Sequence, residues 1–247
     1  IMSELNEKSI ALARSIYRDH KKAVILFTDV FERNEEKDYD LLTQARDIKA
    51  ICLKKDISHV DIFSRKGNVE IFLIGNDEAT NVSQAVQITT QINQKNTKRN
   101  IKVFVFSTQP SAPYIIDSIR YDNLMEHTGQ YGEDCFKLRR IDEKRQLIWN
   151  TVPKMKVFDI ADRHEKTLSV MIVGFGNYGM EFFKMLIWYC QFEGYQLQIN
   201  IFDKQDNLEK LINKACPELL QKNCCSVEGE SHYDIKIFSG VYAEKSK

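Results

Sequence analysis

A strand-like run that leads directly into a glycine-rich turn constrains the fold of this chain more than any other feature. Leu168–Val173 is apolar and rich in β-branched residues, and Gly174, Gly176 and Gly179 follow it at G-x-G-x-x-G spacing. In a strand–turn–helix unit, the first glycine permits the tight turn and the second lets the backbone approach a pyrophosphate. The third lets the helix pack close to the strand. The pattern therefore predicts a dinucleotide-binding βαβ unit.

An acidic residue stands where the ribose of a bound nucleotide would lie. The next predicted strand is Leu197–Phe202, and Asp203 follows it directly. A carboxylate in this place can accept hydrogen bonds from ribose hydroxyls and repels a 2′-phosphate, so we expect NAD or another adenine nucleotide in preference to NADP. The predicted cofactor-binding residues of this unit are Gly174, Phe175, Gly176, Asn177, Tyr178, Gly179 and Asp203.

The helix expected after the turn, Met180–Phe192, is apolar nearly all round. A helix of this kind is buried on more than one side. We expect one side to face the sheet and another to meet the first domain or a second subunit, so the chain is predicted to form a homo-oligomer. Trp188 and Tyr189 are interpreted as core or interface residues.

Apolar runs and amphipathic stretches alternate along the rest of the chain, which is typical of βαβ units and a mostly parallel sheet. The predicted strands are Ala23–Thr28, Ala50–Leu53, Val69–Ile74, Ile101–Phe106 and Phe136–Arg139. The predicted helices are Asn6–Tyr17, Tyr39–Lys49, a helix containing Val82, Ala85, Val86 and Thr89, and a short helix at Ser111–Ile119.

This rhythm predicts two Rossmann-like, doubly wound parallel-sheet α/β domains in series. The first spans residues 1–150, residues 151–166 form a linker containing Pro153, and the second spans 167–247. No strand with a glycine turn precedes the first helix, so the first domain is expected to lack its opening strand; a different α/β topology is the alternative. Tyr233–Phe238 is the expected third strand of the second sheet, which we expect to be truncated at the C-terminus.

Charge and hydropathy exclude several classes of partner. Lys plus Arg and Asp plus Glu both number 35, and this balance argues against nucleic acid as a ligand. The longest apolar stretch, Phe182–Cys190, is interrupted by Lys184 and is too short to insert into a membrane. The six cysteines show no C-x-x-C spacing. We therefore expect a cytoplasmic protein.

Polar residues in the first domain follow successive predicted strands. Asp29 ends the strand Ala23–Thr28, Asp56 follows the next strand, and Asn76–Glu78 with Asn81 follow the strand after that. This order resembles the regulator-of-potassium-conductance (RCK) family, including the Trk-type potassium-uptake regulators. The resemblance covers about 120 residues and implies a Rossmann NAD-binding domain in which Asp29 and Asp56 contact the nucleotide.

This chain departs from the family pattern near Asp56. Lys55 stands where the family has a glycine, and Ile57-Ser58 replaces Ala-Thr. The resemblance also implies a membrane transporter or channel subunit as the regulated partner.

The sequence shows no catalytic motif: H-E-x-x-H, G-x-S-x-G, the P-loop and metal-ligand spacings are all missing. Metal binding is therefore not expected, and the chain is not expected to be an enzyme. The first hypothesis is a nucleotide-binding regulatory module that takes NAD or an adenine nucleotide. The alternatives are an NAD-dependent oxidoreductase whose substrate domain lies outside this segment, and a scaffold with a vestigial pocket.

Overall fold

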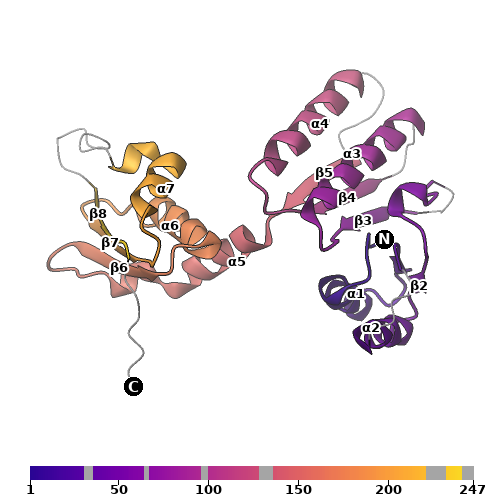
Figure 1. The fold of residues 1–247 in the computed structure, drawn as a ribbon, viewed down its shortest axis with the longest axis horizontal. Coiled ribbons are helices and arrows are strands. Elements are labelled where there is room, and N and C mark those ends of the chain that lie inside the picture. The colour runs from indigo at the N-terminus through magenta and orange to yellow at the C-terminus, as the bar shows by residue number, and fades with distance from the viewer. Residues whose placement is uncertain (31–35, 64–66, 96–99, 128–135, 221–231, 241–247) are drawn as a thin grey trace. The chain divides into compact units, whose positions relative to one another are not determined.

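The computed structural model describes residues 1–30, 36–63, 67–95, 100–127, 136–220 and 232–240 (Figure 1). The chain divides into two compact units, Ile1–Glu143 and Lys144–Lys247. In both, helices alternate with strands, and every strand pair is parallel. The expected α/β class with parallel sheets is confirmed. None of the described helices is both long and apolar enough to cross a membrane.

The first unit contains helices α1 (Glu7–Asp19), α2 (Glu36–Asp47), α3 (Glu78–Lys95) and α4 (Ala112–His127), with a 3₁₀ turn at Ile57–His59. Its strands are β1 (Leu26–Phe27), β2 (Ile51–Cys52), β3 (Val69–Leu73), β4 (Ile101–Phe106) and β5 (Phe136–Ile141). The helix expected at Ser111–Ile119 thus continues to His127.

The position of the opening strand in the first unit is occupied. Met2 pairs in parallel with Phe27 of β1 and with Phe72 of β3. Its N–H donates to the Leu26 carbonyl at 2.8 Å, and the Phe72 N–H donates to the Ile1 carbonyl at 2.8 Å. The order across the sheet is therefore β2, β1, the Met2 segment, β3, β4, β5, as in a doubly wound dinucleotide-binding sheet.

This arrangement corrects the expectation that the first domain lacks its opening strand. Ile1–Ser3 supply a short strand in the centre of the sheet, and a turn leads from it into α1. A run of three residues is too short for hydrophobic periodicity to reveal, because strand patterns need about four to eight residues.

Helices cover both faces of the first sheet. On one face Ile10 and Ala13 of α1 form a core with Phe27 and Ala45. On the other face the buried side chains of α3 and α4 pack against alternate residues of β3 and β4; these are Val82, Ala85, Ile88, Ile116, Ile71, Leu73, Val103 and Val105. The alternation follows from the two-residue period of a strand, which sends successive side chains to opposite faces.

The second unit contains helices α5 (Glu143–Thr151, which begins at the last residue of the first unit), α6 (Asn177–Tyr189) and α7 (Leu208–Ala215). It also has 3₁₀ turns at Val152–Met155, Val157–Ile160 and Pro217–Leu220. Strands β6 (Thr167–Val173), β7 (Gln196–Phe202) and β8 (Tyr233–Phe238) pair in parallel in the order β6, β7, β8.

One face of the second sheet is packed against helices. Phe183 and Leu186 of α6 and Ile212 of α7 share a core with Leu168 and Ile199 of the strands. The intervening positions of β6 differ: Met171 is 65% exposed and Val173 is 77% exposed. Within the described residues, this second sheet thus resembles the half of the first sheet that carries α1 and α2.

Residues 151–166 are not a separate linker. Val152 and Val157 are buried, and Val157 belongs to the core of the second unit. Asp162 pairs with Thr167 at the start of β6. The units divide between Glu143 and Lys144 instead. Proline and charged residues suggested an exposed connection, and most of these side chains are exposed, but Val157 and Ala161 belong to the core of the second unit.

Helix α6 is buried on the sheet side but not all round. Phe183, Met185 and Leu186 are buried, whereas Trp188 is 63% exposed. The Trp188 ring lies against Trp149 of α5, with ring centroids 4.9 Å apart. On the outer side of this helix, Trp188 therefore meets α5 of the same unit.

Candidate functional site

The three glycines of the turn after β6 differ in what the structure demands of them. Gly174 has a φ of +88°, in the left-handed region that side chains disfavour. A Cβ at Gly179 would lie 2.2 Å from the Gly174 carbonyl oxygen, so α6 packs against the turn only because this residue has no side chain. A Cβ at Gly176 would meet no described atom within 4 Å. Neither packing nor a left-handed φ therefore explains Gly176, which leaves open space beside the backbone.

Helix α6 presents an uncapped N-terminus to this open space. Its N-cap is Gly176, no side chain in the described part of the chain makes a cap hydrogen bond, and no acidic residue lies in the first turn. The first intrahelical bond runs from the Met180 N–H to the Gly176 carbonyl at 2.9 Å. The N–H groups before Met180 lie at the positive end of the helix dipole, where phosphate oxygens bind in nucleotide-binding proteins.

Asp203 lies against the turn and its carboxylate binds backbone. One oxygen, Oδ2, accepts a hydrogen bond from the Phe175 N–H, and the other, Oδ1, accepts one from the Gln205 N–H at 2.8 Å. Asp203 is buried. The Phe175 N–H, followed by the Gln205 N–H, stabilises the charged form and holds the pKa of this carboxyl below its usual range.

Phe175 anchors the turn through its side chain as well. The ring is buried and meets the Phe183 ring of α6 edge to face, with centroids 5.5 Å apart. Asn177 and Tyr178, by contrast, are exposed at the start of α6. The structure thus brings all seven residues predicted in the second unit to the carboxyl ends of β6 and β7, where ligands of open α/β sheets bind.

The two acids predicted in the first unit lie at the carboxyl ends of β1 and β2. Asp29 has a left-handed backbone, with a φ of 54°, and its N–H donates to the Lys55 carbonyl at 2.8 Å. Asp56 caps the 3₁₀ turn that follows β2: its Oδ1 accepts the Ser58 N–H at 2.7 Å, and its Oδ2 accepts the Gln84 side-chain amide at 2.8 Å. Asp56 therefore joins this turn to α3.

The pKa of Asp56 reflects these contacts. Burial raises it, but the hydrogen bonds from Ser58 and Gln84 outweigh burial and leave the pKa below its usual value.

The registers of the two sheets show which residues correspond. Met2 pairs with Phe27 in the first unit, and Ile172 pairs with Ile201 in the second. Taking these pairs as equivalent places the two helix N-caps, Asn6 and Gly176, at the same position, and it also places Asp29 with Asp203. The glycines Gly174, Gly176 and Gly179 then correspond to Glu4, Asn6 and Ser9.

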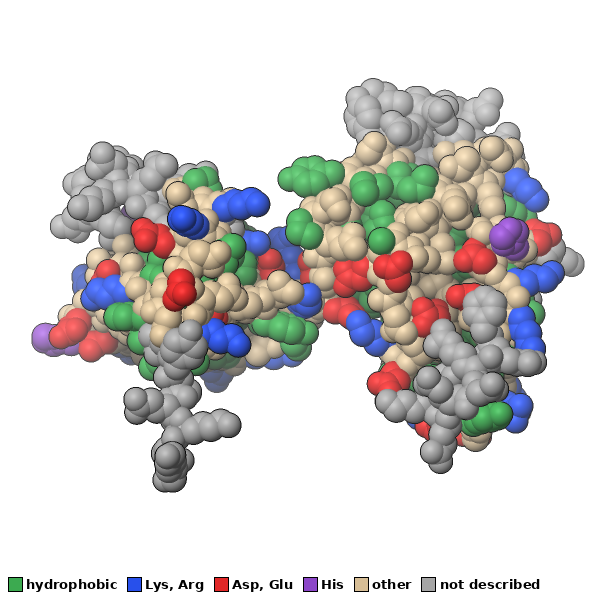
Figure 2. Space-filling model, viewed as in Figure 1, with side chains coloured by type: hydrophobic (Ala, Val, Ile, Leu, Met, Phe, Trp, Pro, Cys, Tyr) green, Lys and Arg blue, Asp and Glu red, His purple; other side chains and the backbone are tan. Residues whose placement is uncertain are grey.

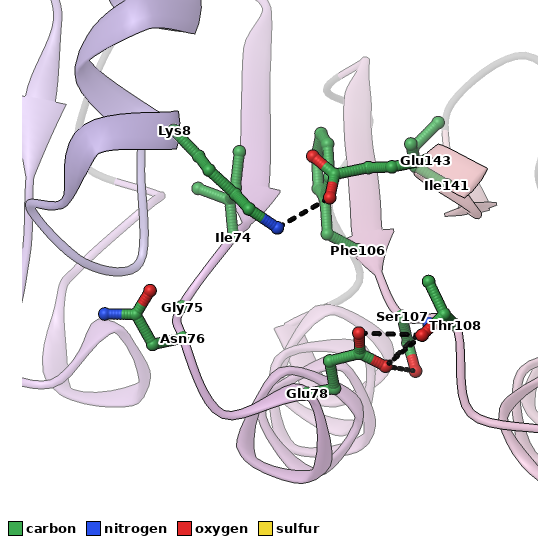
Figure 3. A pocket seen from close by; sticks show the side chains of 10 residues that line it. All are labelled: Lys8, Ile74, Gly75, Asn76, Glu78, Phe106, Ser107, Thr108, Ile141 and Glu143. Atoms are coloured by element: carbon green, nitrogen blue, oxygen red, sulfur yellow. Dashed lines mark hydrogen bonds and ion pairs between the residues drawn. The ribbon is translucent and has the colours of Figure 1, made fainter. Parts of the chain in front are cut away.

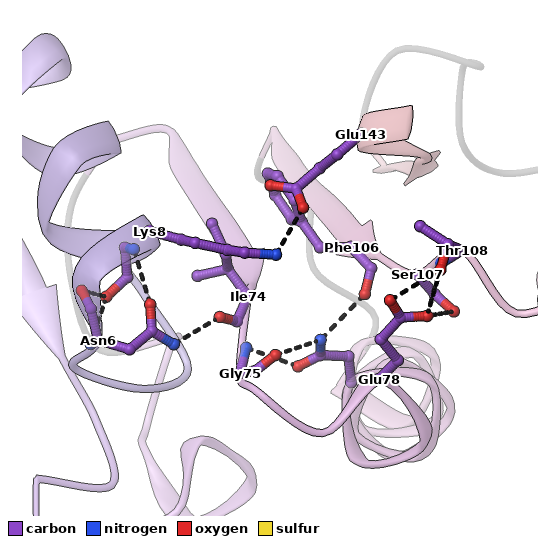
Figure 4. A network of polar contacts seen from close by, with 11 residues as sticks. Asn6, Lys8, Ile74, Gly75, Glu78, Phe106, Ser107, Thr108 and Glu143 are labelled. Carbon is purple, nitrogen blue, oxygen red and sulfur yellow. Dashed lines mark hydrogen bonds and ion pairs between the residues drawn. The ribbon is translucent and has the colours of Figure 1, made fainter. Parts of the chain in front are cut away.

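The N-terminus of α1 is closed by its own side chains. The Asn6 side-chain oxygen accepts the Ser9 N–H at 2.9 Å, and the Ser9 hydroxyl oxygen accepts the Asn6 N–H at 2.9 Å. The Asn6 side-chain amide also donates to the Ile74 carbonyl at 2.9 Å (Figure 4). This reciprocal capping box satisfies two of the N–H groups that a phosphate would otherwise use.

Glu4 places a negative charge at the same turn. Its carboxylate accepts two hydrogen bonds from Asn76, one from the backbone N–H at 2.9 Å and one from the side-chain amide at 2.8 Å. The carboxylate lies next to Gly75, at the carboxyl end of β3. Because this carboxylate and Glu7 in the first turn of α1 repel anions, the first unit disfavours a pyrophosphate here.

A small pocket lies beside this turn, at the carboxyl ends of β3, β4 and β5 (Figure 3). Its charged side chains are paired across it. The Lys8 Nζ lies 2.6 Å from the Glu143 Oε2. The Glu78 carboxylate accepts hydrogen bonds from the N–H of Thr108 at 2.6 Å and from its hydroxyl at 2.9 Å. Asn81 joins the ends of β3 and β4, because its side chain forms hydrogen bonds with the backbone of Gly75 and with the Phe106 carbonyl. These contacts hold the strand ends together.

Figure 2 shows several Asp and Glu side chains gathered on the visible face of the first unit. In the described part of the chain, no group of three or more His, Cys, Asp or Glu residues is arranged to hold a metal ion.

Sequence reasoning missed the corresponding turn in the first unit. The helix start was expected at Asn6, but Asn6 followed by Ser9 was not identified as a capping box, although this spacing is a cap signature. The Lys8–Glu143 pair joins residues 135 positions apart and had no local signal.

No protein-family model, curated protein or solved structure matches this chain.

Proposed function

We propose that the second unit binds NAD or another adenine nucleotide at the turn Gly174–Gly179, with the pyrophosphate at the N-terminus of α6. The observation that carries this proposal is Gly176. Among the described residues, its missing side chain relieves no contact, and none of their side chains caps the end of α6. A glycine kept only for packing would resemble Gly179, whose Cβ would collide with the backbone.

The first unit supports the proposal by contrast. At the matching position Asn6 caps its helix, and Glu4 adds a carboxylate nearby. The chain therefore holds one open turn and one closed turn on the same scaffold, and we propose that it binds one nucleotide per chain.

The role that fits this arrangement is a regulatory module. One unit would sense the nucleotide and the other would serve as a rigid body through which occupancy is passed to a partner. In line with the resemblance to the RCK and Trk-type regulators, we propose a membrane transporter or channel subunit as that partner and a cytoplasmic homo-oligomer as the working form.

Binding can be tested by isothermal titration of NAD, NADH, ADP and ATP into the full chain and into Gly176→Val. The valine has room in the folded protein but fills the space proposed for the pyrophosphate. We expect the wild type to bind at least one of these ligands and the variant to lose affinity by about tenfold or more.

Ser169→Val is the matched control, because it adds a similar side chain to an exposed position of β6. It should bind like the wild type. Equal affinity in Gly176→Val, or no binding to the folded wild type, would refute the site.

A further inference from the structure

Resting on the proposed function, we infer that Asp203 is a positioning residue of the phosphate turn and does not read the ribose. Both oxygens of its carboxylate accept backbone N–H groups, one from Phe175 in the turn after β6 and one from Gln205 in the loop after β7. The side chain therefore ties together the two loops that border the proposed ligand.

Burial makes these two bonds costly to exchange. Asp203 is only 9% exposed and Phe175 only 3% exposed. Hydrogen bonds to an ionised carboxylate are among the stronger ones in proteins, and a buried N–H that loses its acceptor is destabilising. If the carboxylate turned to a ribose hydroxyl, the Phe175 N–H would lose the acceptor that it now has.

The bond from Phe175 also fixes the donors that a phosphate needs. It orients the peptide that follows Gly174, the residue with a φ of +88°, and the next residues are Gly176 and the start of α6. Asp203 thus acts on the ligand through the turn. The part of the ligand that depends on Asp203 is therefore its pyrophosphate, so removal of this carboxylate should not change the preference at the 2′-position of the ribose.

The test compares NADH with NADPH, because the two ligands share the pyrophosphate and differ at the 2′-position. Dissociation constants are measured by titration of the full chain as wild type, Asp203→Ala and Asp203→Asn. We expect both variants to bind both ligands more weakly by about tenfold. The ratio of the two constants should stay within about twofold of the wild-type ratio.

Asp206→Ala is the matched control, because it removes an exposed carboxylate from the same loop and should leave both constants unchanged. Circular dichroism is used to check that each variant is folded. Asp203→Asn keeps the size of the side chain and one acceptor, so it remains measurable if Asp203→Ala does not fold.

Two results would overturn the inference while leaving the site intact. One is a shift of the ratio by about tenfold toward NADPH when the carboxylate is removed, which identifies a ribose ligand. The other is unchanged affinity in both Asp203 variants. Failure of the folded wild type to bind either dinucleotide would also overturn this inference, whereas binding of ADP or ATP in the titration above would leave the proposed function standing.

Discussion

The turn before α1 and the turn before α6 occupy equivalent places in their sheets, yet only the first caps the helix that follows it. In the first unit Asn6 and Ser9 cap each other, and Asn6 also bonds the Ile74 carbonyl. In the second unit Gly176 provides no cap, and the end of α6 is open. The free N–H groups at a helix N-terminus can be bonded either by a capping side chain, which stabilises the helix, or by a ligand.

The acids that follow the second strand of each unit show a similar divergence. Asp203 is buried against its turn, whereas Asp29 has a left-handed backbone that pairs with Lys55. The N–H of each acid donates to a carbonyl of a neighbouring segment, Lys55 for Asp29 and Phe238 for Asp203. The two residues thus share this backbone contact, and Asp29 is set apart by its left-handed φ of 54°.

The largest change in stability should come from Gly179→Ala. Alanine normally stabilises a helix relative to glycine by about 0.5–1 kcal/mol. Here its Cβ would meet the Gly174 carbonyl oxygen at 2.2 Å, so we expect the second unit to lose about 3 kcal/mol. Both tryptophans of the chain, Trp149 and Trp188, lie in the second unit, so urea unfolding followed by their emission reports on this unit.

A gain in stability from Gly179→Ala would show that α6 does not depend on this close approach. Ser9→Ala, at the matching position of the first unit, should leave the tryptophan-detected transition unchanged.

Asn6→Ala should have the next largest effect, because it removes the cap of α1 and leaves the buried Ile74 carbonyl without this donor. We expect the first unit to lose about 1–2 kcal/mol. Hydrogen exchange of peptides from α1, read by mass spectrometry, measures the loss.

The control for Asn6→Ala is Asn207→Ala, which changes the N-cap of α7, where no side-chain cap bond is made. It should alter exchange very little. Comparable losses in the two variants would mean that the capping box does not distinguish the first unit.

Asp203→Asn should have a smaller effect on stability, seen as a weaker dependence of unfolding on pH in acid. The pKa of Asp203 is lowered in the folded state, mainly by the Phe175 N–H, from an unfolded value of 3.8. The folded chain therefore binds fewer protons there than the unfolded chain, and the stabilisation is complete above pH 3.8 and is lost as the pH falls through the folded pKa. Tryptophan-detected unfolding of Asp203→Asn should depend less steeply on pH in this range.

Asp56→Asn serves as the comparison for the acid experiment. The pKa of Asp56 is also lowered, but Asp56 lies in the first unit, so its variant should keep the wild-type pH dependence of the tryptophan signal. An unchanged slope in Asp203→Asn would contradict the contact with Phe175.

The smallest change in stability should come from Gly176→Asn, which copies Asn6 of the first unit onto the second. The backbone of Gly176 is extended, with a φ of −71°, so asparagine fits and can cap α6. We expect a gain of about 0.3 kcal/mol together with loss of NADH binding. Retained binding in a stabilised variant would mean that capping and ligand binding do not compete at this turn.

Local sequence was sufficient for most elements and for the open turn. A G-x-G-x-x-G between an apolar strand and a helix states requirements that depend on a few neighbouring residues, such as the left-handed φ of Gly174. It could not show that Ile1–Ser3 complete the first sheet, because their partners are Leu26 and Phe72. Nor could it show that Val157 and Ala161, in the segment expected to be a linker, belong to the core of the second unit.

The sequence by itself determined the parallel α/β class, the position of the turn after β6 and the presence of an acid after β7, because glycine conformation and strand periodicity are local properties. Only the tertiary structure decided what these residues contact. It closed the first turn with Asn6 and left Gly176 open, and it directed Asp203 to the Phe175 N–H. Hydrogen-bond partners depend on which distant segments fold together, and that information is absent from any short stretch of the chain.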